Sequence, residues 1–303
     1  MKKDLFFVFL LSLASFFAIG CEKDTIFNFE PVPYGPHSDP PIISIEGVRK
    51  TGTAVLNGFM HEGIFRRSQG MAISDGVLYC LFTTGMCKTY DISDIDNPKP
   101  LGTFELGSYS DNNHANSAQF HIESNGEKYV YISGMGGRCF VEKITETSST
   151  LVQTITLDEI DYLKKTKRVN MLCGDDGYMY LFGIDKHGDS LVFARVRRPD
   201  PTSGNATITK DDILDFWHNN DYYYYDSLAQ GGKVYKGNLF FVFGSTTSDR
   251  HLDVYNIFTH EKVYSYNLNN AISEEPEDCD LVDGHIMVTV TGGRGYYLLK
   301  LKN

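Results

Sequence analysis

The sequence is short of positive charge and of tryptophan. Its 303 residues include 28 lysines and arginines against 39 aspartates and glutamates, which gives a formal net charge of −11. Because nucleic-acid binding requires clustered lysine and arginine, this balance excludes DNA and RNA as partners. Tryptophan occurs once, whereas tyrosine (19) and phenylalanine (20) are abundant, and this aromatic composition favours strands over helices.

Motifs that mark common catalytic or metal centres are also missing. The sequence contains no nucleophile elbow, no Walker motif, no HExxH pair and no cysteine–histidine spacing typical of zinc. Beyond position 21 there are five cysteines: Cys80, Cys87, Cys139, Cys173 and Cys279. Because the number of cysteines is odd, at least one of them cannot form a disulfide within the chain. We expect all five to be small, buried side chains. Cys80 and Cys87 fall on adjacent predicted strands, which leaves a disulfide between them open.

A long apolar run lies near the N-terminus, at residues 5–17. The run follows the basic Met1-Lys2-Lys3 and precedes Ala18-Ile19-Gly20-Cys21. It is too short for a typical transmembrane helix. This arrangement resembles the lipobox of bacterial lipoproteins, whose cysteine is acylated. The alternative is an ordinary secretory signal with a chance cysteine. We predict a signal peptide at 1–20, lipidation of Cys21 and a proline-rich tether at 21–41. Glu22-Lys23-Asp24 resembles the surface tag of Bacteroides-type lipoproteins, which predicts an outer-membrane lipoprotein at the cell surface.

Turn signals divide the rest of the chain into similar units of four short strands. In residues 69–106, predicted strands at 69–74, 77–82, 86–92 and 101–106 are separated by Asp75-Gly76 and by later turns. Such runs are typical of antiparallel meanders. Similar units begin near residues 69, 114, 169, 230 and 275, so we predict an all-β, five-bladed β-propeller over residues 42–303. The fifth unit has three strands, and we expect an N-terminal strand to complete it.

Two insertions interrupt the predicted units. Thr209 and Asp211-Asp212 are typical of a helix start, and Ile213, Leu214 and Trp217 follow at helical spacing, which predicts a short helix. Residues 158–165 are expected to be a helical or loop insertion. The tyrosines at 222–225 would follow the predicted helix, either as an aromatic platform for sugars or as its packing surface.

The blades carry two resemblances to known repeats. Tyr90-Asp91-Ile92-Ser93-Asp94, Asn97-Pro98 and Leu101-Gly102 resemble the LVIVD-type propeller repeat of surface proteins, over one blade. Four blade starts are similar to those of five-bladed propellers in the helveticin, phage receptor-binding and teichoic-acid-protein group: Gln69-Gly70, His114-Ala115-Asn116, Gln230-Gly231 and Glu275-Pro276-Glu277. The chain departs from that pattern at Asp278, where the group has glycine. The resemblance implies a cell-surface binding module without a known catalytic centre.

The first strand of each blade should line the central channel, so the starts of these strands should meet at one mouth. The expected ligand-binding site there comprises Gln69, His114, Asn116, Asn170, Gln230, Glu275, Glu277 and Asp278. Amide and carboxylate groups can hydrogen-bond sugar hydroxyls or coordinate Ca²⁺, and no other cofactor is expected. Alternatively, these groups hydrogen-bond neighbouring blades and trapped water.

From these features we expect a lipoprotein that binds a glycan or cell-envelope polymer at the mouth without catalysing a reaction. One alternative is a glycoside hydrolase or lyase in the same funnel. It would use carboxylates of Glu275, Glu277 and Asp278 with a partner from another blade, such as Asp111 or Asp226. The other alternative is a protein-interaction scaffold, which predicts a channel plugged by apolar side chains.

Overall fold

The computed structural model describes residues 31–111, 113–158, 169–184, 191–219 and 229–302. The chain divides into two units, residues 1–31 and 32–303, and the second contains every assigned strand. The predicted signal peptide, Cys21 and the tyrosines at 222–225 lie outside the described residues, as does nearly all of the predicted insertion at 158–165. Among the residues described, no helix is both long and apolar enough to cross a membrane.

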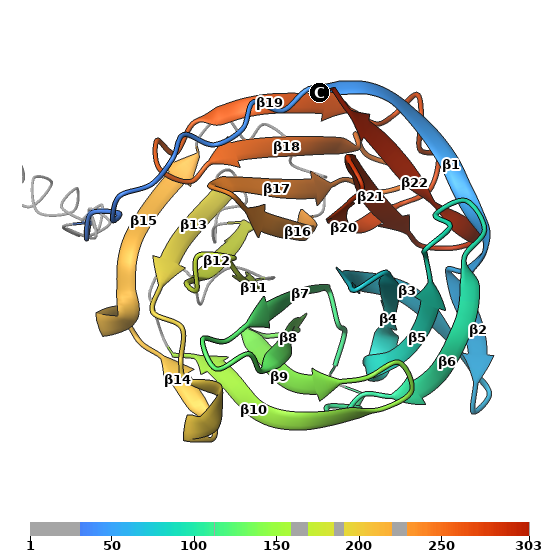
Figure 1. Ribbon diagram of the computed structural model, residues 1–303, viewed down its shortest axis with the longest axis horizontal. Coiled ribbons are helices and arrows are strands. Elements are labelled where there is room, and N and C mark those ends of the chain that lie inside the picture. The colour runs from blue at the N-terminus through green and yellow to red at the C-terminus, as the bar shows by residue number, and fades with distance from the viewer. Residues whose placement is uncertain (1–30, 112, 159–168, 185–190, 220–228, 303) are drawn as a thin grey trace, which may run out of the picture. The chain divides into compact units, whose positions relative to one another are not determined.

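The second unit is a ring of five mainly antiparallel sheets, the blades (Figure 1). The inner strands contact one another in the order β3, β7, β11, β16, β20 and back to β3. Blade 1 contains β2 (Gly58–His61), β3 (Ile64–Ser74), β4 (Val77–Phe82), β5 (Met86–Asp91) and β6 (Lys99–Glu105). Blade 2 contains β7 (Ser117–Ile122), β8 (Lys128–Gly134), β9 (Arg138–Ile144), β10 (Ser149–Leu157) and the parallel β14 (Ala206–Ile208).

The remaining blades have four strands each. Blade 3 contains β11 (Val169–Cys173), β12 (Met179–Ile184), β13 (Leu191–Val196) and β15 (Ile213–Asn219). Blade 4 contains β16 (Ala229–Tyr235), β17 (Asn238–Phe243), β18 (His251–Asn256) and β19 (Lys262–Asn267). Blade 5 contains β20 (Pro276–Val282), β21 (His285–Val290), β22 (Arg294–Leu301) and β1 (Ile45–Leu56). The predicted all-β, five-bladed propeller is therefore confirmed.

An N-terminal strand closes the ring. β1 pairs antiparallel with β22 and forms the outer strand of blade 5, which Figure 1 shows as blue beside red. Beyond β1, Nδ2 of Asn57 donates to the carbonyl of Gly295 (2.6 Å). The closure gives the last blade four strands, as the sequence predicts, and it covers an edge of β22 that would otherwise be unpaired.

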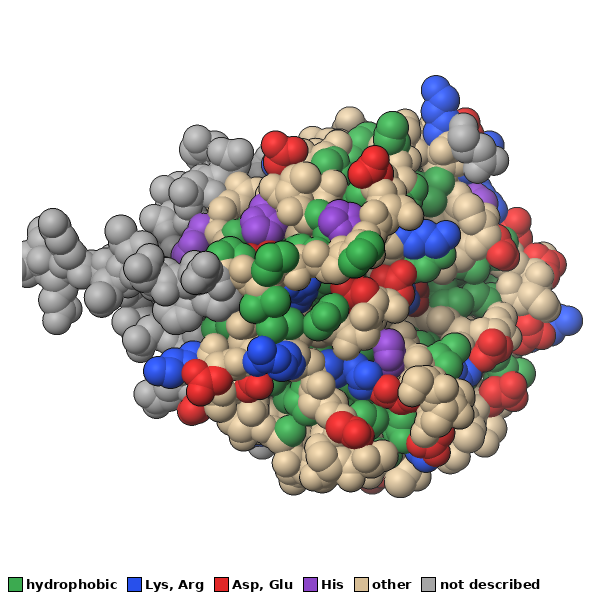
Figure 2. All heavy atoms as spheres, turned by 60° about the vertical axis from the view of Figure 1, so that its left-hand side comes forward, with side chains coloured by type: hydrophobic (Ala, Val, Ile, Leu, Met, Phe, Trp, Pro, Cys, Tyr) green, Lys and Arg blue, Asp and Glu red, His purple; other side chains and the backbone are tan. Residues whose placement is uncertain are grey.

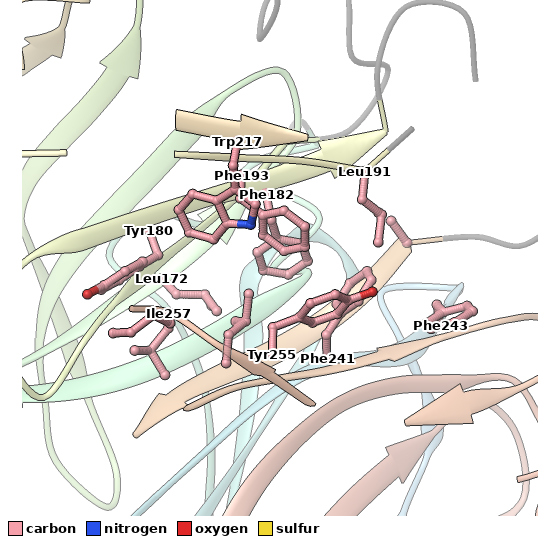
Figure 3. Packing of buried hydrophobic residues seen from close by; sticks show 13 residues of the cluster. Leu172, Tyr180, Phe182, Leu191, Phe193, Trp217, Phe241, Phe243, Tyr255 and Ile257 are labelled. Carbon is pink, nitrogen blue, oxygen red and sulfur yellow. The ribbon is translucent and has the colours of Figure 1, made fainter. Parts of the chain in front are cut away.

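Apolar cores lie between neighbouring blades, so both faces of a middle strand are covered. All six residues of β4 are buried, which explains its continuous apolar sequence. Figure 3 shows the core between blades 3 and 4, where Phe182 contacts Phe241 edge-on at 4.6 Å between ring centroids. In the same core the ring of Trp217 stacks on Phe193 at 5.1 Å. The scattered aromatic residues of the sequence thus hold adjacent blades together.

The predicted helix after Thr209 is wrong. Thr209 does cap a turn, because its hydroxyl accepts from the N–H of Asp211, but the turn is a single 3-10 segment, Lys210–Asp212. The chain then continues as β15, which pairs with β13 as the outer strand of blade 3. Pairing with β13 and burial of Trp217 against Phe193 outweigh the local helical spacing.

The five described cysteines are all buried and free, as expected for small apolar side chains. The register excludes a disulfide between Cys80 and Cys87. Cys87 lies opposite Leu81, and Cys80 lies opposite Lys88, so the two sulfurs point to opposite faces of blade 1. Accordingly, Cys80 packs in the core toward blade 5 and Cys87 in the core toward blade 2.

The described end of the predicted tether packs against the ring. The N–H of Val32 donates to the carbonyl of Leu214 (2.8 Å), and the ring of Tyr34 contacts Phe258 edge-on at 4.9 Å. Farther along, Nδ2 of Asn238 donates to the carbonyl of Pro41 (3.0 Å). Residues 32–41, which we name the strap, therefore cross blades 3 and 4, and they do not form a free spacer.

Candidate functional site

Three inner strands carry a β-bulge at the same place. The pairing of β3 with β4 shifts between Ser68 and Met71, and the pairing of β16 with β17 shifts between Ala229 and Gly232. The pairing of β20 with β21 shifts between Pro276 and Asp278. Bulges redirect side chains and are common beside functional sites. The bulged residues include three of the predicted site residues: Gln69, Gln230 and Glu277.

Asp278 closes the axis of the ring beneath these bulges. Its Oδ2 accepts from the N–H of Met71 (2.9 Å) in blade 1, and its Oδ1 accepts from the hydroxyl of Ser117 (2.9 Å) in blade 2. A Cβ at Gly231 of blade 4 would collide with the same carboxylate, so glycine is needed there. Burial raises the pKa of the Asp278 carboxyl well above its usual range, against the opposing effect of the Met71 and Ser117 hydrogen bonds.

Polar side chains also fill the axis below Asp278. Nζ of Lys233 lies 2.8 Å from Oδ1 of Asp280, and Nε2 of Gln119 donates to the carbonyl of Val234 (2.7 Å). The apolar plug that a protein-interaction scaffold predicts is therefore not observed at these described positions. Because the axis is closed, a ligand at the mouth would enter a blind hollow and not a through-channel.

Above Asp278 lies a hollow of about 190 Å³, which we name the mouth hollow. It is lined by Arg67, Gln69, Thr83, His114, Asn116, Ala229, Gln230, Glu275, Glu277 and Thr291. Six of the eight predicted ligand-binding residues therefore line one hollow, although they come from four blades and span more than 200 positions of sequence. Whether they bind a ligand stays a prediction.

Asn170 and Asp278 are the two predicted residues that do not line the mouth hollow. Nδ2 of Asn170 donates to the carbonyl of Gln230 (2.9 Å), and its Oδ1 accepts from the hydroxyl of Ser133 (3.3 Å). Asn170 thus links blade 3 to blades 4 and 2. The contacts of Asn170 and Asp278 are hydrogen bonds between blades, which is the alternative that the sequence left open for these residues.

Internal hydrogen bonds orient several groups of the mouth hollow. Nδ1 of His114 and Oδ1 of Asn116 are 2.6 Å apart. Nε2 of Gln230 donates to Oε1 of Glu275 (3.0 Å), which fixes that carboxylate relative to blade 4. Oγ1 of Thr291 is buried and has no hydrogen-bond partner among the described residues, so it is available to a ligand.

Four residues that line the mouth hollow were missed by sequence reasoning: the apolar Ala229 beside Gln230, and the polar Arg67, Thr83 and Thr291. Arg67 is exposed and stands two residues before Gln69, which places both on the same face of an extended strand. That spacing could have identified Arg67 from the sequence. Thr83 and Thr291 follow the second strands β4 and β21, and sequence reasoning that considered only first strands could not reach them.

The hydrolase alternative suggested a partner carboxylate from another blade, and neither of the two candidates is among the described residues that line the mouth hollow. Asp111 does not line it, and Asp226 is outside the described residues. Within the described part of the chain, no three histidine, cysteine or acidic residues are grouped closely enough to hold a metal ion. Calcium binding stays a prediction from the sequence.

No family model and no curated protein matches this sequence, so the likenesses to helveticin-type propellers and to the LVIVD-type repeat stay resemblances. Solved structures do match. An exo-β-1,3-galactanase from Clostridium thermocellum gives a TM-score of 0.52 at 15% identity over 85% of this chain. The exo-β-1,3-galactanase of Phanerochaete chrysosporium, solved with β-1,3-galactotriose, gives 0.51 at 11% identity over 85% of this chain.

The chain spans 63% and 65% of the length of those two proteins. At such identities the likeness shows a shared propeller fold. It also corrects the function expected from the sequence, because the two matching propellers are named as glycan-acting enzymes, whereas the expected module had no catalytic role.

Proposed function

We propose that this protein is a glycoside hydrolase that acts on the end of a glycan at the mouth hollow. The observation that supports the proposal most is the pair Glu275 and Glu277, two carboxylates that line the same small hollow. The resemblance of the fold to galactanases supports the same class of reaction.

Hydrolysis of a glycosidic bond needs one carboxylic acid to protonate the leaving oxygen and one carboxylate to act as base or nucleophile. Both carboxylates line the mouth hollow, although Glu275 precedes β20 and Glu277 lies in its bulge. Two carboxyl groups that line one hollow of about 190 Å³ are compatible with the roughly 5–10 Å between carboxyl groups that glycosidases use. Glu275 and Glu277 therefore form a usable pair without a carboxylate from another blade.

The two glutamates differ in their surroundings, and we assign their roles accordingly. Glu277 is 5% exposed and is the more buried of the two, so we assign it as the candidate acid. Glu275 is half-buried and is oriented by the amide of Gln230, so it is the candidate base or nucleophile. The amides of Gln69 and Asn116 can hydrogen-bond sugar hydroxyls.

The size and closure of the mouth hollow indicate which part of a glycan it accepts. Its volume of about 190 Å³ is below that of sites that hold drug-sized ligands. Asp278 and Ser117 close the axis beneath it. A terminal sugar fits such a blind hollow, whereas an internal segment of a long chain does not.

The test is release of sugar from defined oligosaccharides. The full-length protein is incubated with a panel of neutral and acidic oligosaccharides that includes β-1,3-galactotriose, and products are separated by chromatography. We expect a monosaccharide to be released from at least one member. Glu277→Gln and Glu275→Gln should each lower the rate by about 10²–10⁴-fold, the usual contribution of a positioned acid or base.

Glu274→Gln is the matched control, because Glu274 precedes Glu275 but does not line the mouth hollow. It should retain most of the activity. Absence of product with every member of the panel, or equal rates for all three variants, would contradict the proposal. A product with a new double bond would instead identify a lyase.

We also propose that Cys21 is acylated and anchors the protein to the outer membrane, on the strength of the lipobox-like sequence before it. Cys21→Ser should move the protein from the membrane fraction to the soluble fraction of the cell. Surface exposure is tested separately, by protease treatment of intact cells. Membrane association that survives Cys21→Ser would contradict the anchor.

A further inference from the structure

A second hollow lies on the face of the ring opposite the mouth. Asp175 and Asp176 follow β11, and Lys236 follows β16, so these residues lie at the ends of the inner strands remote from the mouth. The strap, residues 32–41, forms its other wall. We name this hollow the strap cleft. Its volume of about 540 Å³ falls in the range of small-molecule sites, whereas the mouth hollow is smaller.

An aromatic ring is held in place in the strap cleft by a buried cation. Tyr178 is 39% exposed although it is a large apolar ring. The guanidinium carbon of Arg195 lies 5.1 Å from the centroid of Tyr178 and 3.5 Å from that of Tyr34. Nη2 of Arg195 donates to the carbonyl of Val32 (2.5 Å), so the cation also ties the strap to blade 3. A fixed, exposed ring can stack on the apolar face of a sugar.

Hydrogen-bonding groups surround Tyr178. The carboxylate of Asp175 accepts from the N–H of Lys236 (3.0 Å), and that of Asp176 accepts from the hydroxyl of Tyr180 (2.5 Å) and the N–H of Tyr178 (3.1 Å). A carboxylate has about four acceptor positions, so both retain some for a ligand. These contacts hold the carboxylates in fixed positions beside the ring.

The charges of the strap cleft nearly balance. Three carboxylates, those of Asp39, Asp175 and Asp176, face two cations, Arg195 and Lys236. Figure 2, which brings the left-hand side of Figure 1 forward, shows positive, negative and apolar side chains intermixed there, without a large patch of one sign. Such a surface favours neither a strongly anionic nor a strongly cationic ligand.

We propose that the strap cleft binds a neutral saccharide. One sugar ring stacks on Tyr178, and its hydroxyls donate hydrogen bonds to Asp175 and Asp176 and accept from Lys236. The site is separate from the mouth hollow, and its existence does not depend on hydrolysis there. On a glycan-degrading protein it would hold the polymer while the mouth acts on chain ends.

The single tryptophan provides a readout, and substitutions at position 178 assign its response to the strap cleft. Trp217 belongs to the core cluster that includes Ile257 and against which Phe258 packs, and both of these residues line the strap cleft. Trp217 fluorescence is therefore titrated in the full-length Glu277→Gln variant, to limit hydrolysis at the mouth. The probes are β-1,3-galactotriose, a galacturonic acid trimer and a glucosamine trimer. We expect a saturable change with the neutral trimer and at least tenfold weaker binding of the charged trimers.

Substitutions at position 178 then test the stacking. In the same background, Tyr178→Ala should weaken binding at least tenfold, whereas Tyr178→Phe keeps the ring and should bind within about threefold of the parent. Tyr266→Ala, on β19 and outside the cleft, is the matched control and should change nothing. Circular dichroism verifies that each variant is folded.

Three results would overturn the inference: no saturable response to the neutral trimer, stronger binding of a charged trimer, or undiminished binding by folded Tyr178→Ala. Failure of the hydrolase proposal looks different. In that case the wild type releases no sugar, while the Trp217 response and its loss in Tyr178→Ala remain.

Discussion

At the scale of single residues, Asp278 is the position around which the centre of the ring is built. Its two oxygens accept hydrogen bonds from Met71, Ser117, Ala118 and its own neighbour Cys279. Glycine at 231 leaves the space that the carboxylate needs. The same residue that departs from the helveticin-type pattern is thus a structural link between blades, and it lies below the candidate site and not in it.

We predict that Asp278→Ala lowers the free energy of unfolding by about 2–4 kcal/mol, because it leaves buried N–H and O–H donors without an acceptor. The measurement is urea unfolding followed by circular dichroism. Asp111→Ala is the control, since Asp111 is exposed, and it should change stability by less than about 0.5 kcal/mol. A loss at position 278 no larger than that of the control would show that the axis does not need the carboxylate.

The sequence identified most of the candidate site but not the role of every residue. Gln69, His114, Gln230 and Glu277 could be placed at one mouth because blade starts in a propeller converge. The sequence could not separate Glu277 from Asp278, its neighbour on β20. The bulge between Pro276 and Asp278 decides which of them reaches the hollow and which points to the axis, and a bulge leaves no clear signal in one sequence.

At the scale of elements, the order of the strands could be predicted from the turn residues. The predictions were wrong where the local sequence favours one structure and pairing with distant residues favours another. Thr209 and Asp212 form the capping box that the sequence indicates. The helix nevertheless stops after one turn, because the next residues pair with β13. The strap is a similar case. Its prolines predict an extended chain, but its contacts with Leu214 and Phe258 depend on residues about 180 and 220 positions away along the chain.

The closure between β1 and the start of blade 5 carries a titratable contact. Glu274 forms an ion pair with Lys50 of β1 and accepts from the hydroxyls of Tyr297 and Ser273 (both 2.8 Å). Burial alone would raise the pKa of Glu274, but the hydrogen bonds from Lys50, Tyr297 and Ser273 lower it to about 2. The charged form of Glu274 is therefore the form that stabilises the closed ring.

Because this pKa is lower in the folded chain than in the unfolded one, the stabilisation is present above about pH 4.5 and is lost as the pH falls toward about 2. Near neutral pH we expect Glu274→Gln to be less stable than the wild type by about 1 kcal/mol, since the ion pair is partly solvated. Near pH 2 the two should be equally stable. Urea titrations at several pH values measure the difference, and one that does not change with pH would contradict this assignment.

At the scale of the whole molecule, closure by an N-terminal strand makes the ring depend on both ends of its chain. β1 covers β22, and the blade 5 core includes apolar residues of both. We predict that a chain beginning at residue 57 fails to form a stable monomer, whereas a chain beginning at residue 32 folds. Size-exclusion chromatography with circular dichroism distinguishes these results. A peptide of residues 45–56 added to the shorter chain should restore folding, and a stable monomer without it would contradict the proposed closure.

The fold could be predicted from the sequence because the blade repeats five times, and each repeat carries its own turn signals. Function could not be predicted in the same way. One resemblance implied a binding module, whereas two solved propellers that match this chain are named as galactanases. What distinguishes a binding site from a catalytic one is the relative position of Glu275, Glu277 and their neighbours, which depends on closure of the ring.

In the proposed complex, a terminal sugar occupies the mouth hollow with its glycosidic oxygen beside residue 277. The most direct test is a crystal structure of Glu277→Gln with an oligosaccharide that the wild type cleaves. We predict a terminal ring bounded by Gln69, Asn116 and Gln230, with the glycosidic oxygen about 2.6–3.2 Å from the substituted side chain. An empty mouth hollow, with the oligosaccharide bound elsewhere on the ring, would contradict catalysis at this site.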